Sequence, residues 1–312
     1  MNVLLTGCAG FIGSHTAEAL VAAGHSVRGV DAFTDYYDPS LKRANVAGLL
    51  GHPSFELVEA DLATADVDAL LDGVDAVAHL AGQPGVRASW DAGFAVYVER
   101  NVLVTQRLLE AARRAGTGRF VYASSSSIYG DAESFPTPEG VMPRPVSPYG
   151  VTKLAGEHLV SLYGTNFGLP TVSLRYFTVY GPRQRPDMAT WRMVDAALHG
   201  TTFPLFGDGT AARSFTFVAD VAAANLTALV ADVAPGAVVN LSGSETVDVN
   251  ELLRLVGQAA GTEVPVERRD AEPGDARRTG GDTARALELL GWTAATPLAD
   301  GVAAQVAWQR HH

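Results

Sequence analysis

Cysteine is almost absent from this chain of 312 residues, which contains only Cys8. A single cysteine excludes disulfides within the chain and fits a reducing compartment, so a cytoplasmic location is expected. Apolar runs long enough to cross a bilayer are also missing. Met1 and Asn2 lead directly into an apolar segment, without the basic region of a signal peptide. We therefore expect no membrane partner.

Basic residues are few as well. The chain has 23 lysines and arginines against 34 aspartates and glutamates, which gives a net charge of −11. Such an acidic chain is a poor ligand for nucleic acid, so no nucleic-acid partner is expected. To bind an anion, an acidic protein must gather positive charge locally, which makes clustered arginines informative. His311 and His312 are consistent with a tag remnant and are left out of the fold prediction.

The length suffices for one large α/β unit and a smaller lobe. Short apolar runs alternate with helical patterns through the first half, and each run is followed by a polar or glycine-rich segment. This alternation predicts a doubly wound, mostly parallel sheet of the Rossmann type, with ligands at the carboxyl ends of its strands. One long helix is expected over Asp91–Ala115, with Gly116 just past its end.

A glycine-rich turn follows the first apolar run. Gly7, Gly10 and Gly13 show the spacing GxxGxxG and are followed by a helical pattern that stops at Gly24. Glycines let backbone N–H groups approach a pyrophosphate at the positive end of a helix. The next predicted strand ends in Asp31, whose carboxylate suits an adenosine ribose diol and repels a 2′-phosphate. These features predict NAD, rather than NADP, as the cofactor.

A second motif begins at Ser147, a good helix cap, and Pro148, which suits the first helical position. Tyr149 and Lys153 follow four residues apart, on one face of the new helix. A phenol beside a fixed ammonium can ionise near neutral pH, so the pair predicts a general base that takes a proton from an alcohol. Because YxxxK is a short motif, an ordinary exposed tyrosine and lysine are the alternative.

Together these motifs give the chain a resemblance to the extended short-chain dehydrogenase/reductases, over nearly its whole length. The matching segments are TGCAGFIG at 6–13, Asp31, Asp61-Leu62, HLAG at 79–82, SSSSIYG at 124–130 and YGVTK at 149–153. The resemblance implies that Ser125, Tyr149 and Lys153 are catalytic, with Ser125 donating to the sugar oxygen whose proton Tyr149 removes. At least two of the four serines at 124–127 are expected to form an ordinary polar loop.

The resemblance also implies which residues hold the two ligands, a cofactor and a UDP-sugar. The expected cofactor residues are Gly7, Gly10, Phe11, Ile12, Gly13, Asp31, Asp61, Leu62, Leu80, Ala81, Gly82, Lys153 and Tyr176. The expected UDP-sugar residues are Ser125, Ser126, Ser127, Tyr149, Thr178, Arg185, Pro204, Phe206, Arg213, Asp275 and Arg278. No metal is expected.

Two segments of the second half resemble the epimerase subgroup. In the segment GDGxxxR, Arg213 is expected to bind a nucleotide phosphate, a role that suits a guanidinium fork; a surface ion pair is the alternative. The segment PGD ends in Asp275, which is expected to meet a ribose or sugar hydroxyl. Galactose-type enzymes place an arginine where this chain has Glu272, so Arg277 or Arg278 is expected to supply that charge.

Two short sequence resemblances indicate the nature of the sugar. DYYDPSLKR at 35–43 resembles a stretch of UDP-glucuronate 4-epimerases, as does Thr178 with Arg185 seven residues on. A desolvated sugar carboxylate needs a charged partner and hydroxyl donors, so Ser126 and Ser127 are expected to complete a cradle for it. The structural alternative is that Arg185 caps a loop and Thr178 simply packs.

The expected function is reversible 4-epimerisation of UDP-glucuronic acid to UDP-galacturonic acid, through a 4-keto intermediate and tightly bound NAD. The nearest alternative is a UDP-glucose/UDP-galactose 4-epimerase. A UDP-uronate decarboxylase or a 4,6-dehydratase is disfavoured because serines at 125–127 replace their glutamate. A 4-keto reductase and a non-catalytic nucleotide sensor are further alternatives. Family likeness implies a homodimer formed through residues 91–115 and the helix after Ser147.

The predicted division has two parts. An NAD-binding unit covers residues 1–170, and strands near 171–178 and 237–242 return to it. A UDP-sugar lobe takes up most of 179–312, because proline, glycine and arginine at 178–189 mark a change of role.

Overall fold

The computed structural model describes residues 1–270 and 277–312. Its centre is a seven-stranded sheet in the order β11-β6-β5-β4-β1-β2-β3, in which every neighbouring pair is parallel. The strands are β1 (Asn2–Thr6), β2 (Ser26–Asp31), β3 (Phe55–Glu59), β4 (Ala76–His79), β5 (Arg119–Ser125), β6 (Thr171–Tyr176) and β11 (Ala237–Leu241). The predicted Rossmann-type α/β class is therefore confirmed.

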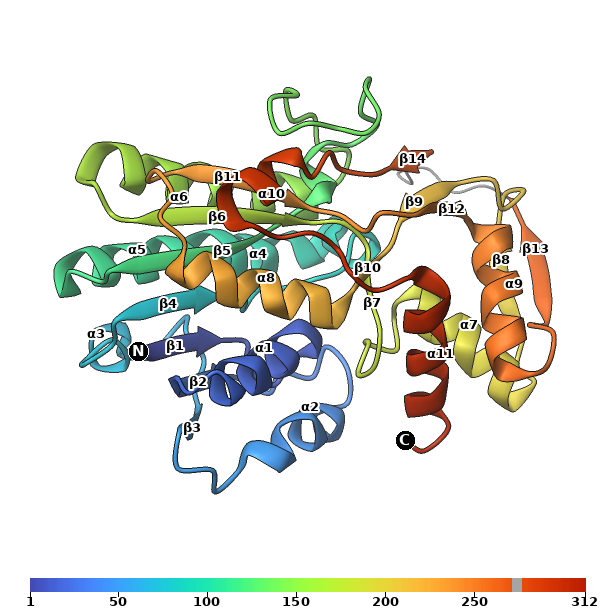
Figure 1. Cartoon of the computed structure of the whole chain (residues 1–312), viewed down its shortest axis with the longest axis horizontal. Coiled ribbons are helices and arrows are strands. Elements are labelled where there is room, and N and C mark those ends of the chain that lie inside the picture. The colour runs from blue at the N-terminus through green and yellow to red at the C-terminus, as the bar shows by residue number, and fades with distance from the viewer. Residues whose placement is uncertain (271–276) are drawn as a thin grey trace.

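Helices cover both faces of this sheet (Figure 1). Successive strand residues point to opposite faces, so Leu5 packs toward α1 and α8, whereas Leu4 packs toward α5 and α6. The helices of this unit are α1 (Phe11–Ala22), α2 (Pro39–Val46), α3 (Val67–Leu70), α4 (Phe94–Val98), α5 (Val104–Ala115), α6 (Pro148–Phe167), α8 (Val218–Val230) and α10 (Ala284–Leu290). Within the described residues, no helix is both long and apolar enough to cross a membrane.

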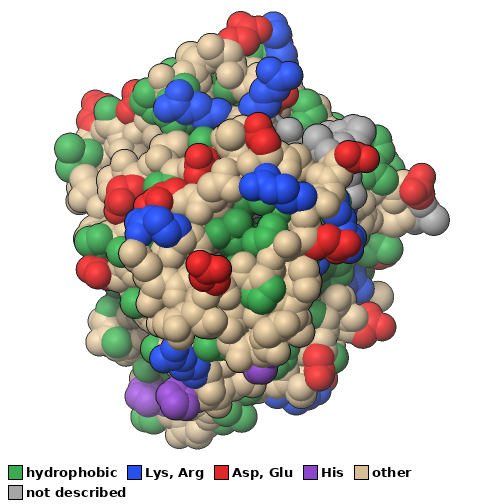
Figure 2. All heavy atoms as spheres, turned by 90° about the vertical axis from the view of Figure 1, so that its right-hand side faces the viewer, with side chains coloured by type: hydrophobic (Ala, Val, Ile, Leu, Met, Phe, Trp, Pro, Cys, Tyr) green, Lys and Arg blue, Asp and Glu red, His purple; other side chains and the backbone are tan. Residues whose placement is uncertain are grey.

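A smaller lobe lies at one end of the large sheet (Figure 1). Its core includes Tyr180, Met193, Leu252 and Val302. Its helices are α7 (Ala189–His199), α9 (Val249–Ala260) and α11 (Leu298–Gln309), and its strands are β7 (Val179–Tyr180), β8 (Phe203–Phe206), β9 (Ala212–Ser214), β10 (Thr216–Phe217), β12 (Thr246–Asp248), β13 (Val266–Arg269) and β14 (Arg278–Thr279). Figure 2 shows basic and acidic side chains mixed on its outer face, around an apolar hollow.

The expected single helix over Asp91–Ala115 is wrong in detail. A 3₁₀ turn at Asp91–Gly93 and α4 lead into a π-helical turn at Glu99–Leu103, and only then does α5 begin. The side chain of Asn101, within the π turn, accepts a bond from the Gln83 amide at 2.7 Å and donates to the Gln83 carbonyl at 3.1 Å. A π turn often marks a functional site, and this one ties the helix to the loop after β4.

Candidate active site

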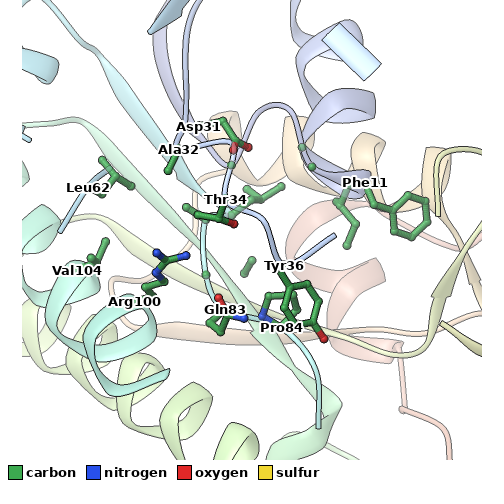
Figure 3. A pocket seen from close by; sticks show the side chains of 18 of the residues that line it. Phe11, Asp31, Ala32, Thr34, Tyr36, Leu62, Gln83, Pro84, Arg100 and Val104 are labelled. Atoms are coloured by element: carbon green, nitrogen blue, oxygen red, sulfur yellow. The ribbon is translucent and has the colours of Figure 1, made fainter. Parts of the chain in front are cut away.

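A cavity lies along the carboxyl ends of β1, β2, β4, β5 and β6. Figure 3 shows Asp31 and Thr34 around one part of it, and Tyr36, Gln83 and Pro84 around another. Every residue expected to bind the cofactor lines this cavity. The lining also contains residues to which the sequence assigned no role, among them Thr34, Tyr36, Tyr37, Lys42, Gln83, Pro84, Arg100 and Val104. Assignment of individual residues to the cofactor stays a prediction.

The glycine-rich turn at one side of the cavity fits a pyrophosphate. Gly10 caps α1 without a side-chain hydrogen bond, and the first turn of α1 holds no acidic residue, so the helix start is left positive. A Cβ at Gly13 would lie 1.9 Å from the Gly7 carbonyl oxygen, and Gly7 itself has a φ of 71°. Only glycine therefore allows strand and helix to approach this closely.

Asp31 also fits its expected role at the adenosine ribose. Its carboxylate accepts bonds from the amides of Phe33 at 2.8 Å and Ala9 at 3.2 Å, which fix its orientation at the end of β2. The buried ammonium of Lys42 lies 3.5 Å from the same carboxylate and 3.3 Å from the Thr34 hydroxyl. Lys42 had no assigned role in the sequence prediction, although it lies in the DYYDPSLKR stretch.

The expected helix start is confirmed. The Ser147 hydroxyl accepts a bond from the Gly150 amide at 3.1 Å, and Pro148 is the first residue of α6. Lys153, one turn further, is buried and donates to the Ala123 carbonyl at 2.7 Å. Burial lowers the pKa of Lys153 to about 8. Its ammonium is therefore held against the end of β5, and it lines the same cavity as Tyr149.

The surroundings of the Tyr149 phenol act on its pKa in opposite directions. Desolvation by burial raises the pKa of Tyr149, opposed by a hydrogen bond from Ser125 and, after it, by the positive charge of Arg185. The sequence had assigned that electrostatic effect to Lys153. The structure therefore adds Arg185 as a cation that acts on the phenol.

The serine run divides into separate roles. Ser124 donates to the buried Glu157 carboxylate at 2.6 Å, which is a structural contact. The Ser125 hydroxyl accepts a bond from the Ser127 amide at 3.1 Å and is placed to bond Tyr149. Ser126 and Ser127 lie half-buried in a 3₁₀ turn. No carboxylate belongs to this run, and the exclusion of dehydratase chemistry stays a prediction.

The residues expected to hold the sugar nucleotide are not all gathered in this cavity. Tyr149 and Arg185 line it, whereas the described lining leaves out the others of that set. Arg185 forms a bidentate pair with the carboxylate of Asp187, two residues on in the same loop, at 2.9 and 3.0 Å, so a role in stabilising this loop stays an alternative. Thr178, beside β7, has a φ of 26°, a strained value for a β-branched residue.

Four further predicted residues lie on strands of the smaller lobe. Pro204 and Phe206 are on β8, and the guanidinium of Arg87 stacks 4.5 Å from the Phe206 ring. Arg213 lies on β9, whose parallel neighbour β14 begins with Arg278. The guanidinium of Arg278 lies 3.5 Å from the Phe135 ring centre. Glu272 and Asp275 lie outside the described residues, so their assignments stay predictions.

Known proteins resemble this chain in sequence and in fold. An uncharacterised UDP-glucose epimerase of Bacillus subtilis is 41% identical over 309 residues, which cover 99% of this chain and 98% of the relative. The crystal structure of UDP-glucuronic acid 4-epimerase from Bacillus cereus, in complex with UDP-glucuronic acid and NAD, is 39% identical, with a TM-score of 0.96 and 99% of each chain covered. UDP-glucose 4-epimerase from Thermotoga maritima, with UDP-glucose, is 30% identical with a TM-score of 0.91, again over 99% of each chain.

A model of the NAD dependent epimerase/dehydratase family matches residues 3–242. The match spans the glycine-rich turn, the serine run and the Tyr149–Lys153 motif, the features from which family and cofactor were predicted. Together with the relatives above, it confirms that prediction: this chain belongs to the NAD dependent epimerase/dehydratase family.

Proposed function

We propose that this protein is an NAD-dependent UDP-sugar 4-epimerase that prefers UDP-glucuronate and UDP-galacturonate. The observation that carries the proposal is the presence of Arg185 in the cavity that also holds Tyr149 and Lys153. The side chain of Arg185 is 18% exposed, and a nearly buried guanidinium near a base is well suited to recognise a sugar carboxylate.

The chain supplies the proton chemistry. The phenol of Tyr149 takes the proton of the sugar 4-hydroxyl, and Ser125 donates a bond to the same oxygen. Bound NAD supplies a reversible hydride acceptor and a positive charge on its nicotinamide ring. Lys153 and Arg185 favour the phenolate electrostatically once the proton has left. After the 4-keto sugar has rotated to present its other face, the hydride that carbon 4 lost is returned to it and the same residues return the proton. Because both are returned, no net reductant is needed.

With a uronate substrate the site must also prevent a side reaction, the loss of carbon dioxide. Its 4-keto form is a β-keto acid, which loses carbon dioxide when the bond to the carboxylate carbon aligns with the ketone π system. We propose that Arg185, with Thr178 and the hydroxyls of Ser126 and Ser127, holds the carboxylate out of that alignment. The absence of a glutamate from the serine run supports epimerisation over decarboxylation.

The substrate test incubates the purified protein with UDP-glucuronate and, in parallel, with UDP-glucose, and the 4-epimers are then separated by chromatography. We expect interconversion of the two UDP-uronates without added NADH, at a kcat/KM at least about tenfold above that of the hexose pair, because one charge-assisted bond contributes roughly that factor. Turnover of the hexose pair alone would contradict the uronate preference. Stoichiometric consumption of NADH would contradict an epimerase.

The second candidate is a UDP-glucose/UDP-galactose 4-epimerase. One observation favours it: Asp187 already compensates the charge of Arg185, so a neutral hexose would not leave a bare guanidinium. The relatives also divide between the two substrates, with UDP-glucose named for the Thermotoga maritima protein and UDP-glucuronic acid for the Bacillus cereus protein. The parallel incubation distinguishes the two candidates directly.

We also propose a homodimer. The surface formed by α6 and by the π turn before α5 exposes several apolar side chains: Leu103 is 54% exposed, Val151 47% and Leu162 48%. Light scattering is expected to give about twice the chain mass of 32.7 kDa, and Leu162→Arg is expected to give a monomer because an interface core tolerates no unpaired charge. Leu50→Arg, at a 55% exposed leucine elsewhere, is the matched control. A monomer at micromolar concentration without any substitution would refute the dimer.

A further inference from the structure

Arg185 is held by a carboxylate of its own chain. Its Nε donates to Oδ1 of Asp187 at 2.9 Å and its Nη2 donates to Oδ2 at 3.0 Å. Two parallel bonds fix the plane of a guanidinium, which a single bond does not. The pair spans only Pro186, whose ring restricts the backbone between the two partners. The direction in which Arg185 faces the cavity is therefore set by Asp187.

Tyr36 holds the other side of this pair. Its hydroxyl donates to Oδ2 of Asp187 at 3.3 Å, and the guanidinium of Arg185 lies 5.9 Å from its ring centre. Tyr36 follows β2 and Arg185 follows β7, so the contact joins two loops that are far apart in the sequence but line one cavity. A Cβ at Gly85 would lie 2.2 Å from the Tyr36 hydroxyl oxygen, so the chain passes close beneath it.

We propose that Asp187 is a positioning residue that makes this site selective for an acidic sugar, by holding Arg185 ready for the sugar carboxylate. The inference rests on the proposed uronate substrate and adds a residue for which no role was predicted. The bidentate bond uses Nε and Nη2, so Nη1 takes no part in it. In the proposed complex the carboxylate of the sugar bonds the edge of the guanidinium that carries Nη1. Arg185 then lies between the carboxylate of Asp187 and that of the sugar.

Two effects of Asp187 oppose each other. Its negative charge repels a sugar carboxylate, whereas its hydrogen bonds remove the entropy that Arg185 would lose on binding one. Asp187 is 37% exposed and Arg185 18%. Water therefore screens the repulsion between the carboxylates, while the bonds act at contact on Arg185, which lines the cavity. We expect the positioning effect to exceed the repulsion.

The experiment measures KM and kcat of Asp187→Asn for UDP-glucuronate and for UDP-glucose, which serves as a competitive inhibitor if it is not turned over. Asparagine keeps the shape but loses the charge and one acceptor, so the KM for the uronate is expected to rise about tenfold or more. The constants for the neutral hexose are expected to change by about twofold or less. More UDP-pentose is expected as well, because a loosely held carboxylate reaches the alignment for loss of carbon dioxide.

A double-mutant cycle tests whether Asp187 acts through Arg185. In an Arg185→Lys background, an ammonium cannot make the bidentate bond, so Asp187→Asn is expected to have no further effect on the uronate KM. Asp195→Asn, which removes an acidic residue paired with His199 on α7, is the control for net charge.

Three outcomes separate the proposals. If the wild-type protein does not turn over UDP-glucuronate, both the proposed function and this inference are contradicted. A wild-type protein that is active on the uronate, but whose Asp187→Asn variant shows an unchanged or lowered uronate KM, overturns the role of Asp187 alone. Equal losses for both substrates, or additive effects in the cycle, would likewise show that Asp187 is only structural.

Discussion

Tyr149→Phe is expected to lower the turnover of the UDP-sugar by about 10³-fold, within the 10²–10⁴ range for the loss of a general base. The substitution removes one oxygen atom and leaves a ring of the same shape in the cavity beside Lys153 and Arg185. Ser125 cannot act as the base in place of the phenol, because none of its described contacts is a group that could accept its proton as readily as Tyr149. Initial rates of 4-epimer formation at several pH values measure the effect.

Tyr97→Phe is the matched control. The ring of Tyr97 lies 6.2 Å from that of Tyr149, in an edge-to-face arrangement, and its hydroxyl donates to the carbonyls of Pro84 and Gly85. Loss of those bonds is expected to reduce turnover only a few-fold, since the hydroxyl supports a loop rather than the reacting oxygen. Both variants are expected to retain bound NAD. Full turnover by Tyr149→Phe would revive the interpretation of the chain as a nucleotide sensor.

The sequence was sufficient to predict features that depend on residues close together in the chain. A strand followed by GxxGxxG and a helix requires glycine at fixed positions, because Gly7 needs a positive φ and Gly13 needs close approach. Ser147 with Pro148 specifies a helix start through local hydrogen bonding and a fixed φ. The family and the parallel sheet were therefore predicted correctly, and every expected cofactor residue lies along one cavity.

Contacts between distant segments could not be predicted in this way. Asp187 and Tyr36 are 151 positions apart, and no local pattern announces their bond. Desolvation raises the pKa of Tyr149, and this effect depends on the surrounding fold rather than on the four-residue spacing. The π turn before α5 likewise accompanies a contact between distant segments, in which Asn101 bonds the backbone of Gln83.

Glu157→Gln is expected to lower the free energy of unfolding by about 3–5 kcal/mol, the usual result of breaking a buried ion pair. The Glu157 carboxylate bonds Arg175 at 2.6 and 3.0 Å and accepts from Ser124 at 2.6 Å, and the side chains of Glu157 and Arg175 are 4% and 5% exposed. The amide would leave the charge of Arg175 uncompensated in a low-dielectric interior. Denaturant unfolding followed by circular dichroism measures the change.

Two comparisons test whether desolvation of the unpaired charge causes the loss of stability in Glu157→Gln. Glu56→Gln breaks the pair with Arg28, in which Glu56 is 63% exposed, and is expected to cost no more than about 1 kcal/mol. Replacing both Glu157 and Arg175 by methionine is expected to recover much of the loss, because an apolar pair of similar volume often stabilises as well as a buried ion pair. A loss for Glu157→Gln as small as that for Glu56→Gln would contradict the argument. Since Glu157 follows Lys153 by one helical turn, the same pair anchors α6, the helix that carries the proposed catalytic residues, against β5 and β6.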